Sequence, residues 1–213
     1  MKPEIIPSII ARGQRELDSR ISKVSRHFEW LQLDVMDGKF VKNKSLMFDF
    51  KLPKTKCKYE AHLMMKNPLP WIEKNWGKVD TMIIHREVFE KKSELHEMIK
   101  IILSKDVKVG LAINPETKVN ELEPFLDEID LVLFMTVNPG HYGAAFLPKV
   151  LDKVKQLKLK HNFKGEIEVD GGINNKTIHA TLRAGANRFV VGSYLQKAKN
   201  VGEFRETLKG FVD

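Results

Sequence analysis

The sequence predicts an α/β fold in which eight parallel strands close into a single (β/α)8 TIM barrel. Short β-rich segments alternate with amphipathic segments along the whole 213-residue chain, and this alternation is typical of parallel sheets. Several strands are nearly continuous apolar runs, as in residues 131–137 (LVLFMTV), which indicates burial on both faces. The expected strands are residues 4–10, 30–34, 58–63, 81–85, 108–113, 131–135, 166–170 and 188–191.

The segments between the strands predict helices. In residues 16–24, 93–104 and 147–160, apolar side chains recur at helical spacing beside charged ones. An open doubly wound sheet is the alternative, but such a sheet usually has fewer strands, and no G-x-G-x-x-G follows the first strand. Because no Ser-rich or Pro-rich linker divides the chain, we expect residues 1–213 to form a single barrel domain.

Composition and charge narrow the class of protein. Hydrophobic residues make up 42% and charged residues 30%, and no apolar run is long enough to cross a bilayer, so we expect no membrane partner. The net charge is +8, but the lysines are spread along the chain without interleaved aromatic residues, so we expect solvated helix faces and no nucleic-acid partner. We interpret the first ten residues as a strand and not as a leader. The single cysteine, Cys57, is typical of a protein of the reducing cytoplasm.

Three expected strands end in polar residues that can carry chemistry. Asp34, His62 and Asp170 end the second, third and seventh strands. In barrels of this kind the reacting groups lie at the carboxyl ends of the strands. Two carboxylates and an imidazole at one rim predict a small proton-transfer or metal site.

Glycine-containing turns follow the last two strands, where a phosphate commonly binds in such barrels. Gly171 and Gly172 follow the seventh strand, and Gly192 and Ser193 follow the eighth. Glycine lets backbone N–H groups approach an anion closely, so these turns predict a phosphate site. Each turn also has a purely structural interpretation, as a tight turn or a helix N-cap.

Short motifs in chain order resemble those of the ribulose-phosphate 3-epimerase family. The motifs are Pro7-Ser8-Ile9, Asp34-Val35-Met36-Asp37-Gly38, His62-Leu63-Met64, Asn114-Pro115, Met135-Thr136-Val137-Asn138-Pro139-Gly140, Glu168-Val169-Asp170-Gly171-Gly172 and Gly192-Ser193. The resemblance implies a cytoplasmic isomerase that inverts one carbon of a ketopentose 5-phosphate, interconverting ribulose 5-phosphate and xylulose 5-phosphate. We also expect a homo-oligomer.

The resemblance also implies roles for individual residues. Asp34 and Asp170 would be the acid/base pair and would ligate a divalent ion (Zn, Fe, Mn or Mg) together with His62. Ser8 and His62 would contact the substrate, and Met36, Met64 and Met135 would form an apolar collar beside the reacting carbon. The residues that would hold the phosphate are Gly140, Gly143, Gly171, Gly172, Gly192 and Ser193.

The chain departs from the family at several places around this site, among them Lys42, where the family usually has proline, and Tyr194, where a small residue is common. Gln32 stands where the family has histidine as a fourth metal ligand, and a carboxamide oxygen suits manganese or magnesium better than zinc. The family's Gly-Phe-Gly-Gly-Gln stretch corresponds here to Gly140-His141-Tyr142-Gly143-Ala144. An altered substrate, such as another ketose phosphate, or a weakened enzyme would follow from such changes.

Four functions therefore compete. The first is a 3-epimerase acting through Asp34 and Asp170, and the second is a phosphosugar-binding protein that has lost catalysis. The third is a related barrel lyase or decarboxylase, but those relatives carry an Asp-x-Lys-x-x-Asp run, and no lysine lies between Asp34 and Asp37. Nucleic-acid binding is the fourth. His85 and Glu87 end the fourth strand, and we expect no special role for them.

Overall fold

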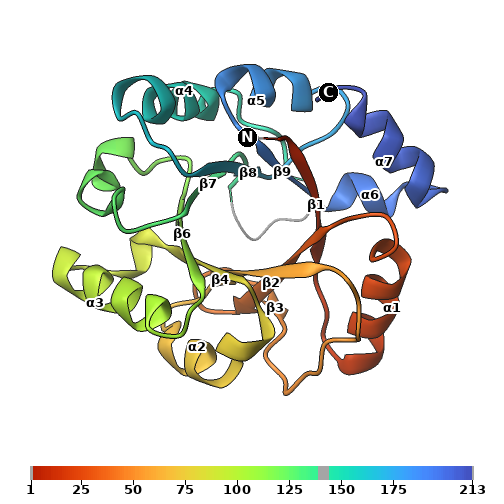
Figure 1. Ribbon diagram of the computed structural model, residues 1–213, viewed down its shortest axis with the longest axis horizontal. Helices are drawn as coiled ribbons and strands as arrows, with labels where there is room; N and C mark the ends of the chain where they lie inside the picture. The colour runs from red at the N-terminus through yellow and green to blue at the C-terminus, as the bar shows by residue number, and fades with distance from the viewer. Residues whose placement is uncertain (1, 139–143, 213) are drawn as a thin grey trace.

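In the computed structural model, which describes residues 2–138 and 144–212, eight parallel strands close into a barrel surrounded by helices (Figure 1). The strands follow one another around the ring in the order β1-β9-β8-β7-β6-β5-β4-β2, and β1 pairs with β2 to close it. The predicted fold class is therefore confirmed. The barrel strands are β1 (Glu4–Ile9), β2 (Trp30–Asp37), β4 (Lys58–Met64), β5 (Thr81–His85), β6 (Lys108–Ile113), β7 (Leu131–Met135), β8 (Glu166–Asp170) and β9 (Arg188–Val191).

The second strand is longer than the sequence predicts. It continues past Asp34 to Asp37, where a short strand, β3 (Lys44–Ser45), pairs with it in the antiparallel direction. Asp37 then closes the turn, because its Oδ1 accepts hydrogen bonds from the backbone N–H groups of Lys39 and Phe40. Asp34 thus lies inside a strand, on the inner wall of the barrel mouth.

Helices follow most of the strands. They are α1 (Gln14–Val24), α2 (Leu69–Asn75), α3 (Lys92–Leu103), α4 (Val150–Lys160), α5 (Ile178–Ala184), α6 (Ser193–Gln196) and α7 (Val201–Lys209). After β6 the expected α-helix is replaced by two 3-10 turns, η3 (Val119–Glu121) and η4 (Glu123–Phe125). Pro124 explains the difference, because proline lacks an N–H and disfavours helical geometry at the residue before it.

The apolar core has two shells. One lies between the strands and the helices, where α1 buries Leu17, Ile21 and Val24. The other fills the barrel itself and includes Ile83 and Leu133. Each strand therefore needs apolar residues on both faces, which explains the continuous apolar runs in the sequence.

A buried polar layer lies in the barrel below the expected site. Arg188 donates to Glu60 and, at 2.7 Å, to Glu168, and all three side chains are at most 1% exposed. The guanidinium also stacks 4.6 Å from the centre of the Trp30 ring. Burial raises the pKa of Glu60 well above its ordinary value, and the charge of Glu168 adds to this rise. A single cation thus holds two buried carboxyl groups.

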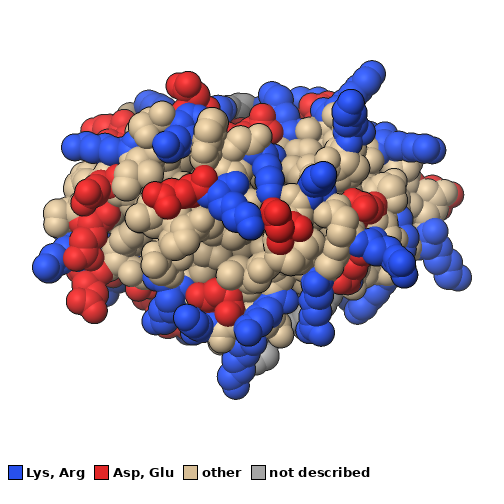
Figure 2. Space-filling model, turned by 90° about the horizontal axis from the view of Figure 1, so that it is seen from below, with Lys and Arg blue, Asp and Glu red and all other residues tan. Residues whose placement is uncertain are grey.

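Surface charges are mixed in sign. On the face seen in Figure 2, Lys and Arg side chains are interspersed with Asp and Glu. This pattern agrees with solvated helix faces. In the described part of the chain, no helix is long and apolar enough to span a membrane.

Replacing Arg188 by methionine is expected to lower the free energy of unfolding by about 3–5 kcal/mol, because it leaves Glu60 and Glu168 buried without a counter-charge. Urea denaturation measures the change. Arg205→Met is the matched control, since Arg205 pairs with Glu206 at the surface (side chains 27% and 67% exposed) and should cost no more than about 1 kcal/mol. Equal effects of the two substitutions would contradict the assignment.

Candidate active site

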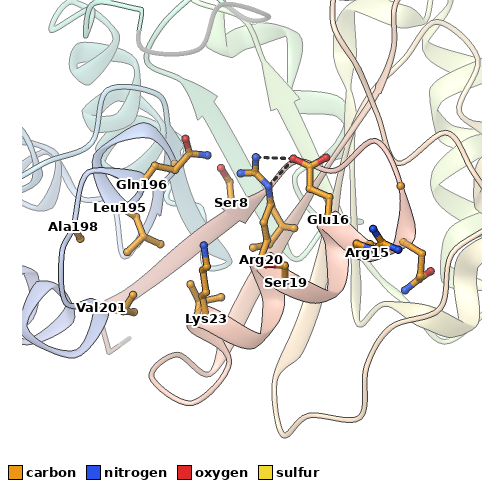
Figure 3. Close-up of a pocket in the computed structure, with 15 residues that line it drawn as sticks. Ser8, Arg15, Glu16, Ser19, Arg20, Lys23, Leu195, Gln196, Ala198 and Val201 are labelled. Atoms are coloured by element: carbon orange, nitrogen blue, oxygen red, sulfur yellow. Dashed lines mark hydrogen bonds and ion pairs between the residues drawn. The ribbon is translucent and has the colours of Figure 1, made fainter.

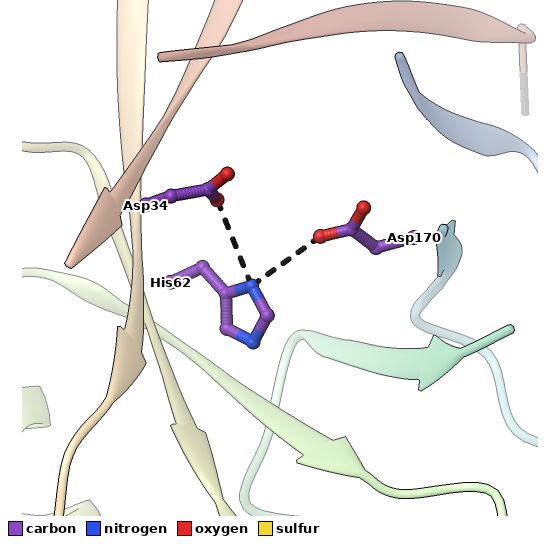
Figure 4. Close-up of side chains that lie close together, drawn as sticks. All are labelled: Asp34, His62 and Asp170. Carbon is purple, nitrogen blue, oxygen red and sulfur yellow. Dashed lines mark ion pairs between the residues drawn. The ribbon is translucent and has the colours of Figure 1, made fainter. Parts of the chain in front are cut away.

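Strands β2, β4 and β8 bring Asp34, His62 and Asp170 together at the barrel mouth (Figure 4). Asp34 and His62 are register partners on adjacent strands, whereas Asp170 faces them from the other side of the ring. His62 Nδ1 lies 3.8 Å from Asp34 Oδ1 and 3.4 Å from Asp170 Oδ2. One ligand atom from each residue falls within 4.8 Å of the others, so the three can hold one metal ion.

Gln32 joins the two carboxylates. It precedes Asp34 by two residues and therefore points to the same side of the strand. Its Nε2 donates to Asp34 Oδ1 at 2.8 Å and to Asp170 Oδ2 at 2.9 Å. The side chain is fully buried, and its Oε1 has no hydrogen-bond partner. The amide thus spans the gap between β2 and β8.

The carboxylates of Asp34 and Asp170 lie close together at a largely buried site and repel one another. Burial, followed by the charge of Asp170, raises the pKa of Asp34 to about 7, and His62, Gln32 and Ser8 only partly offset the rise. Burial lowers the pKa of His62, but the direct polar contact with Asp170, together with the charges of Asp170 and Asp34, outweighs it, so that the net shift is upward. A carboxyl group that titrates near neutral pH suits general acid–base chemistry.

The predicted phosphate turns border the same cavity as the carboxylates. This cavity measures about 90 Å³, and it is lined by Ser8, Asp34, Asp170, Gly171, Gly172, Gly192 and Ser193 among others. Gly171 has a φ of +116°, and a Cβ added there would lie 2.5 Å from Val137, so the turn requires glycine. Gly140 and Gly143, as well as His141 and Tyr142, lie outside the described residues.

The three methionines also line this cavity. Met36 and Met64 pack with Val41 at the mouth, whereas Met135 belongs to the apolar cluster inside the barrel. Three methionine side chains therefore form an apolar part of the cavity wall, and such side chains can fill irregular shapes.

A buried hydrogen-bonded chain beside the site is not predicted by the sequence. His62 Nε2 lies 2.9 Å from His85 Nε2, and His85 Nδ1 lies 3.1 Å from Glu87 Oε2. Glu87 Oε1 in turn accepts from the backbone N–H of Asn114 and from Thr117 Oγ1. The expectation that His85 and Glu87 are unremarkable is therefore wrong for their contacts. The sequence did contain a signal for His85. It lies two residues after Ile83, the register partner of His62, and therefore points to the same side of the sheet as Ile83.

A larger cavity of about 1020 Å³ lies between α1 and the α6–α7 segment (Figure 3). It shares Ser8 and Gly192 with the mouth cavity. Among the described residues that line it, Glu16 is the only carboxylate, it pairs with Arg20 at 2.7 Å, and none is a histidine. We therefore place the chemistry at the mouth, where acid and base groups meet.

Comparison with known proteins identifies the family. The model of the ribulose-phosphate 3 epimerase family matches residues 4–196. The chain belongs to this family. A ribulose-phosphate 3-epimerase of Bacillus subtilis (strain 168) is 35% identical over 95% of this chain and 98% of its own length. The cytoplasmic isoform of the rice enzyme (Oryza sativa subsp. japonica) is 32% identical over 99% of this chain and 94% of its own.

Two solved structures with the same barrel are more distant from this chain than the two relatives above. A 3-hexulose-6-phosphate synthase has a TM-score of 0.70 at 13% identity, and covers 99% of this chain and 100% of its own. A tryptophan synthase α-subunit from Pyrococcus furiosus has a TM-score of 0.69 at 18% identity, over 100% and 99% of the two chains. At these identities the likeness shows the fold alone and does not support the lyase alternative.

The raised pKa of Asp34 predicts how pH affects the stability of the metal-free protein. The pKa is about 7 in the folded state, against about 3.9 in an unfolded chain. Between these values the folded state keeps a proton that the unfolded state releases, so the free energy of unfolding falls as pH rises. This contribution is complete below about pH 4 and lost above about pH 7.

Urea denaturation in EDTA at about pH 5 and about pH 8 tests this prediction. The loss of stability between the two conditions should be larger in the unaltered protein than in Asp34→Asn, by on the order of 2 kcal/mol. The difference between the two proteins isolates Asp34 from other buried acids. Equal losses in both would show that Asp34 ionises normally.

Proposed function

We propose that the protein is a ribulose-phosphate 3-epimerase, an isomerase of pentose phosphate metabolism that interconverts ribulose 5-phosphate and xylulose 5-phosphate. The names of the relatives support this substrate class. The observation that carries the proposal is the pair of carboxylates, Asp34 and Asp170, which face each other across a mouth that also contains two glycine turns.

Inversion at C3 needs a proton to leave one face of the carbon and another to arrive on the opposite face. Asp34 on β2 and Asp170 on β8 approach the mouth from different sides, so a sugar lying between them would meet one carboxyl group on each face. In the metal-free site, burial and the charge of Asp170 raise the pKa of Asp34 to about 7, which suits a group that exchanges protons near neutral pH. Each positioned acid or base typically contributes about 10²–10⁴ in rate.

The other lining residues would position the substrate. Backbone groups of the Gly171-Gly172 turn and of Gly192-Ser193 would hold the phosphate, and the Ser8 hydroxyl, which hydrogen bonds to Asp34, would contact the sugar. The cavity of about 90 Å³ is smaller than the roughly 300 Å³ of typical small-molecule pockets. Binding would therefore require side chains at the mouth to move apart.

The residues present fit a divalent cation. Asp34, His62 and Asp170 would hold it, and two buried atoms beside them, His62 Nδ1 and Gln32 Oε1, have no hydrogen-bond partner. Bound there, the cation would stabilise the negative charge that develops on the substrate when the proton leaves. If the Gln32 amide turned over, its oxygen would join a set rich in oxygen donors, which favours manganese or magnesium over zinc.

The domain organisation, the cellular location and the oligomeric state belong to the same proposal. We infer one domain over residues 1–213, which the continuous ring of strands supports. A cytoplasmic location is supported by the lone Cys57 and by the rice relative. A homo-oligomer stays a prediction from the sequence.

Deuterium incorporation tests the reaction. When the protein is incubated with ribulose 5-phosphate in deuterated water, NMR should show deuterium at C3 and formation of xylulose 5-phosphate. Asp34→Asn and Asp170→Asn should each slow this exchange by about 10²–10⁴. Asp49→Asn removes the same charge from a side chain that is 76% exposed, and should leave the rate unchanged.

The same experiment separates the enzyme from a phosphosugar-binding protein. Calorimetric binding of ribulose 5-phosphate without any deuterium uptake, with Mn²⁺ or Mg²⁺ supplied, would support the binding protein and refute the epimerase. If deuterium exchange at C3 survives in both aspartate variants, the assignment of the two residues is refuted, but the proposed activity is not.

Restoring a histidine tests the contribution of Gln32. In Gln32→His an imidazole would replace the amide beside Asp34 and Asp170, and the affinity for Zn²⁺ measured by calorimetry should rise by at least about 10-fold. Gln156→His places the same residue on α4, far from the mouth, as a control. An unchanged Zn²⁺ affinity in Gln32→His would mean that position 32 does not face the ion.

A further inference from the structure

The two ring nitrogens of His62 have different surroundings. Nδ1 faces the space between Asp34 and Asp170 and has no hydrogen-bond partner, although its side chain is fully buried. Nε2 lies 2.9 Å from His85 Nε2. When two neutral imidazoles share a hydrogen bond, one nitrogen must carry the proton and the other must accept it. The position of a single proton therefore decides what His62 offers to the site.

Glu87 decides which histidine donates. Its Oε1 accepts from the backbone N–H of Asn114 and from Thr117 Oγ1, so Glu87 acts as a carboxylate, which can only accept. Its Oε2 lies 3.1 Å from His85 Nδ1, and this nitrogen must then be the donor. His85 Nε2 is left with its lone pair, and accepts the proton of His62 Nε2.

We propose that Glu87 and His85 are positioning residues that fix the proton of His62 on Nε2, so that the unprotonated Nδ1 faces the space between Asp34 and Asp170. Only the use of Nδ1 by a divalent cation rests on the proposed function. The arrangement of protons rests on the hydrogen bonds of Glu87 and on the contact between the two histidine rings, and it needs no metal.

The surroundings of His85 fix the partners of its two ring nitrogens. Its side chain is fully buried, and both of its ring nitrogens are already used. The ring of Phe40 packs 4.7 Å from that of His85. Glu87 lies in η2 (Arg86–Val88) and is held by Asn114 and Thr117, which follow β6, so the hydrogen-bonded chain runs from β4 through β5 to the segment after β6.

Replacing Glu87 by glutamine should reverse the direction of the hydrogen bonds that link residue 87, His85 and His62. The single carbonyl oxygen of glutamine would keep the donors of Asn114 and Thr117, and its NH₂ group would then donate to His85 Nδ1. His85 would carry its proton on Nε2, and His62 would in turn carry its own on Nδ1, toward the carboxylates. The substitution keeps the shape of the side chain and changes the direction of two hydrogen bonds.

Nitrogen-15 NMR of metal-free protein labelled at histidine reads these protons directly, at about pH 9, where imidazoles are neutral. Spectra of His62→Asn and His85→Asn assign the signals. We expect a protonated Nε2 on His62 and a protonated Nδ1 on His85, and the opposite pair in Glu87→Gln. A protonated Nδ1 on His62 in the unaltered protein would overturn the proposal, whether or not a metal binds.

Titration with Mn²⁺ alone gives a second readout. Glu87→Gln should weaken Mn²⁺ binding by about 10–100-fold. Glu90→Gln, which removes the same charge from an exposed side chain three residues away, should not. Protons on His62 Nε2 and His85 Nδ1 without any Mn²⁺ binding would support the positioning role of Glu87 and His85 and refute the metal in the proposed function. Equal Mn²⁺ affinity in Glu87→Gln and the unaltered protein would refute the effect of the hydrogen-bonded chain on the site.

Discussion

The closed ring of parallel strands is the constraint on which the site depends. Its register sets Asp34 beside His62, and its closure brings Asp170 to within reach of both. An open sheet with the same strands would leave β8 far from β2, because only the pairing of β1 with β9 and with β2 joins the two ends. The chemistry therefore depends on a contact between strands that are distant in the chain.

The barrel interior balances its charges in two layers. In the lower layer, Arg188 supplies a permanent cation to Glu60 and Glu168. In the upper layer, Asp34 and Asp170 meet His62 and the amide of Gln32, and Asp34 also meets the Ser8 hydroxyl, but none of these is a permanent cation. A buried carboxylate such as Asp34, which has no permanent counter-charge beside it, attracts cations. The lower layer thus serves the fold, and the upper layer is left available for protons and metal.

Gln32 occupies the position where the resemblance to the family implies a histidine. A histidine there would offer a nitrogen lone pair, whereas the amide donates to both carboxylates and holds them together. The bridge compensates part of their repulsion in the metal-free protein. An amide can also present its oxygen, so the site keeps a possible fourth ligand of a harder kind.

The sequence by itself determined the strands, the amphipathic helices and the polar residues at the carboxyl ends of the strands. The carboxyl ends of parallel barrel strands meet at one rim, and this was enough to place Asp34, His62 and Asp170 together. Glycine motifs after the last strands were visible as well, since their backbone requirements are local.

Only the tertiary structure decided which side chains meet. Gln32 bonds to a carboxylate 138 residues away, and Arg188 to one 128 residues away. The link from His62 to His85 and Glu87 likewise depends on two neighbouring strands and a turn. Local periodicity contains no information on such partners, because a distant side chain is selected by the closure and stagger of the whole ring.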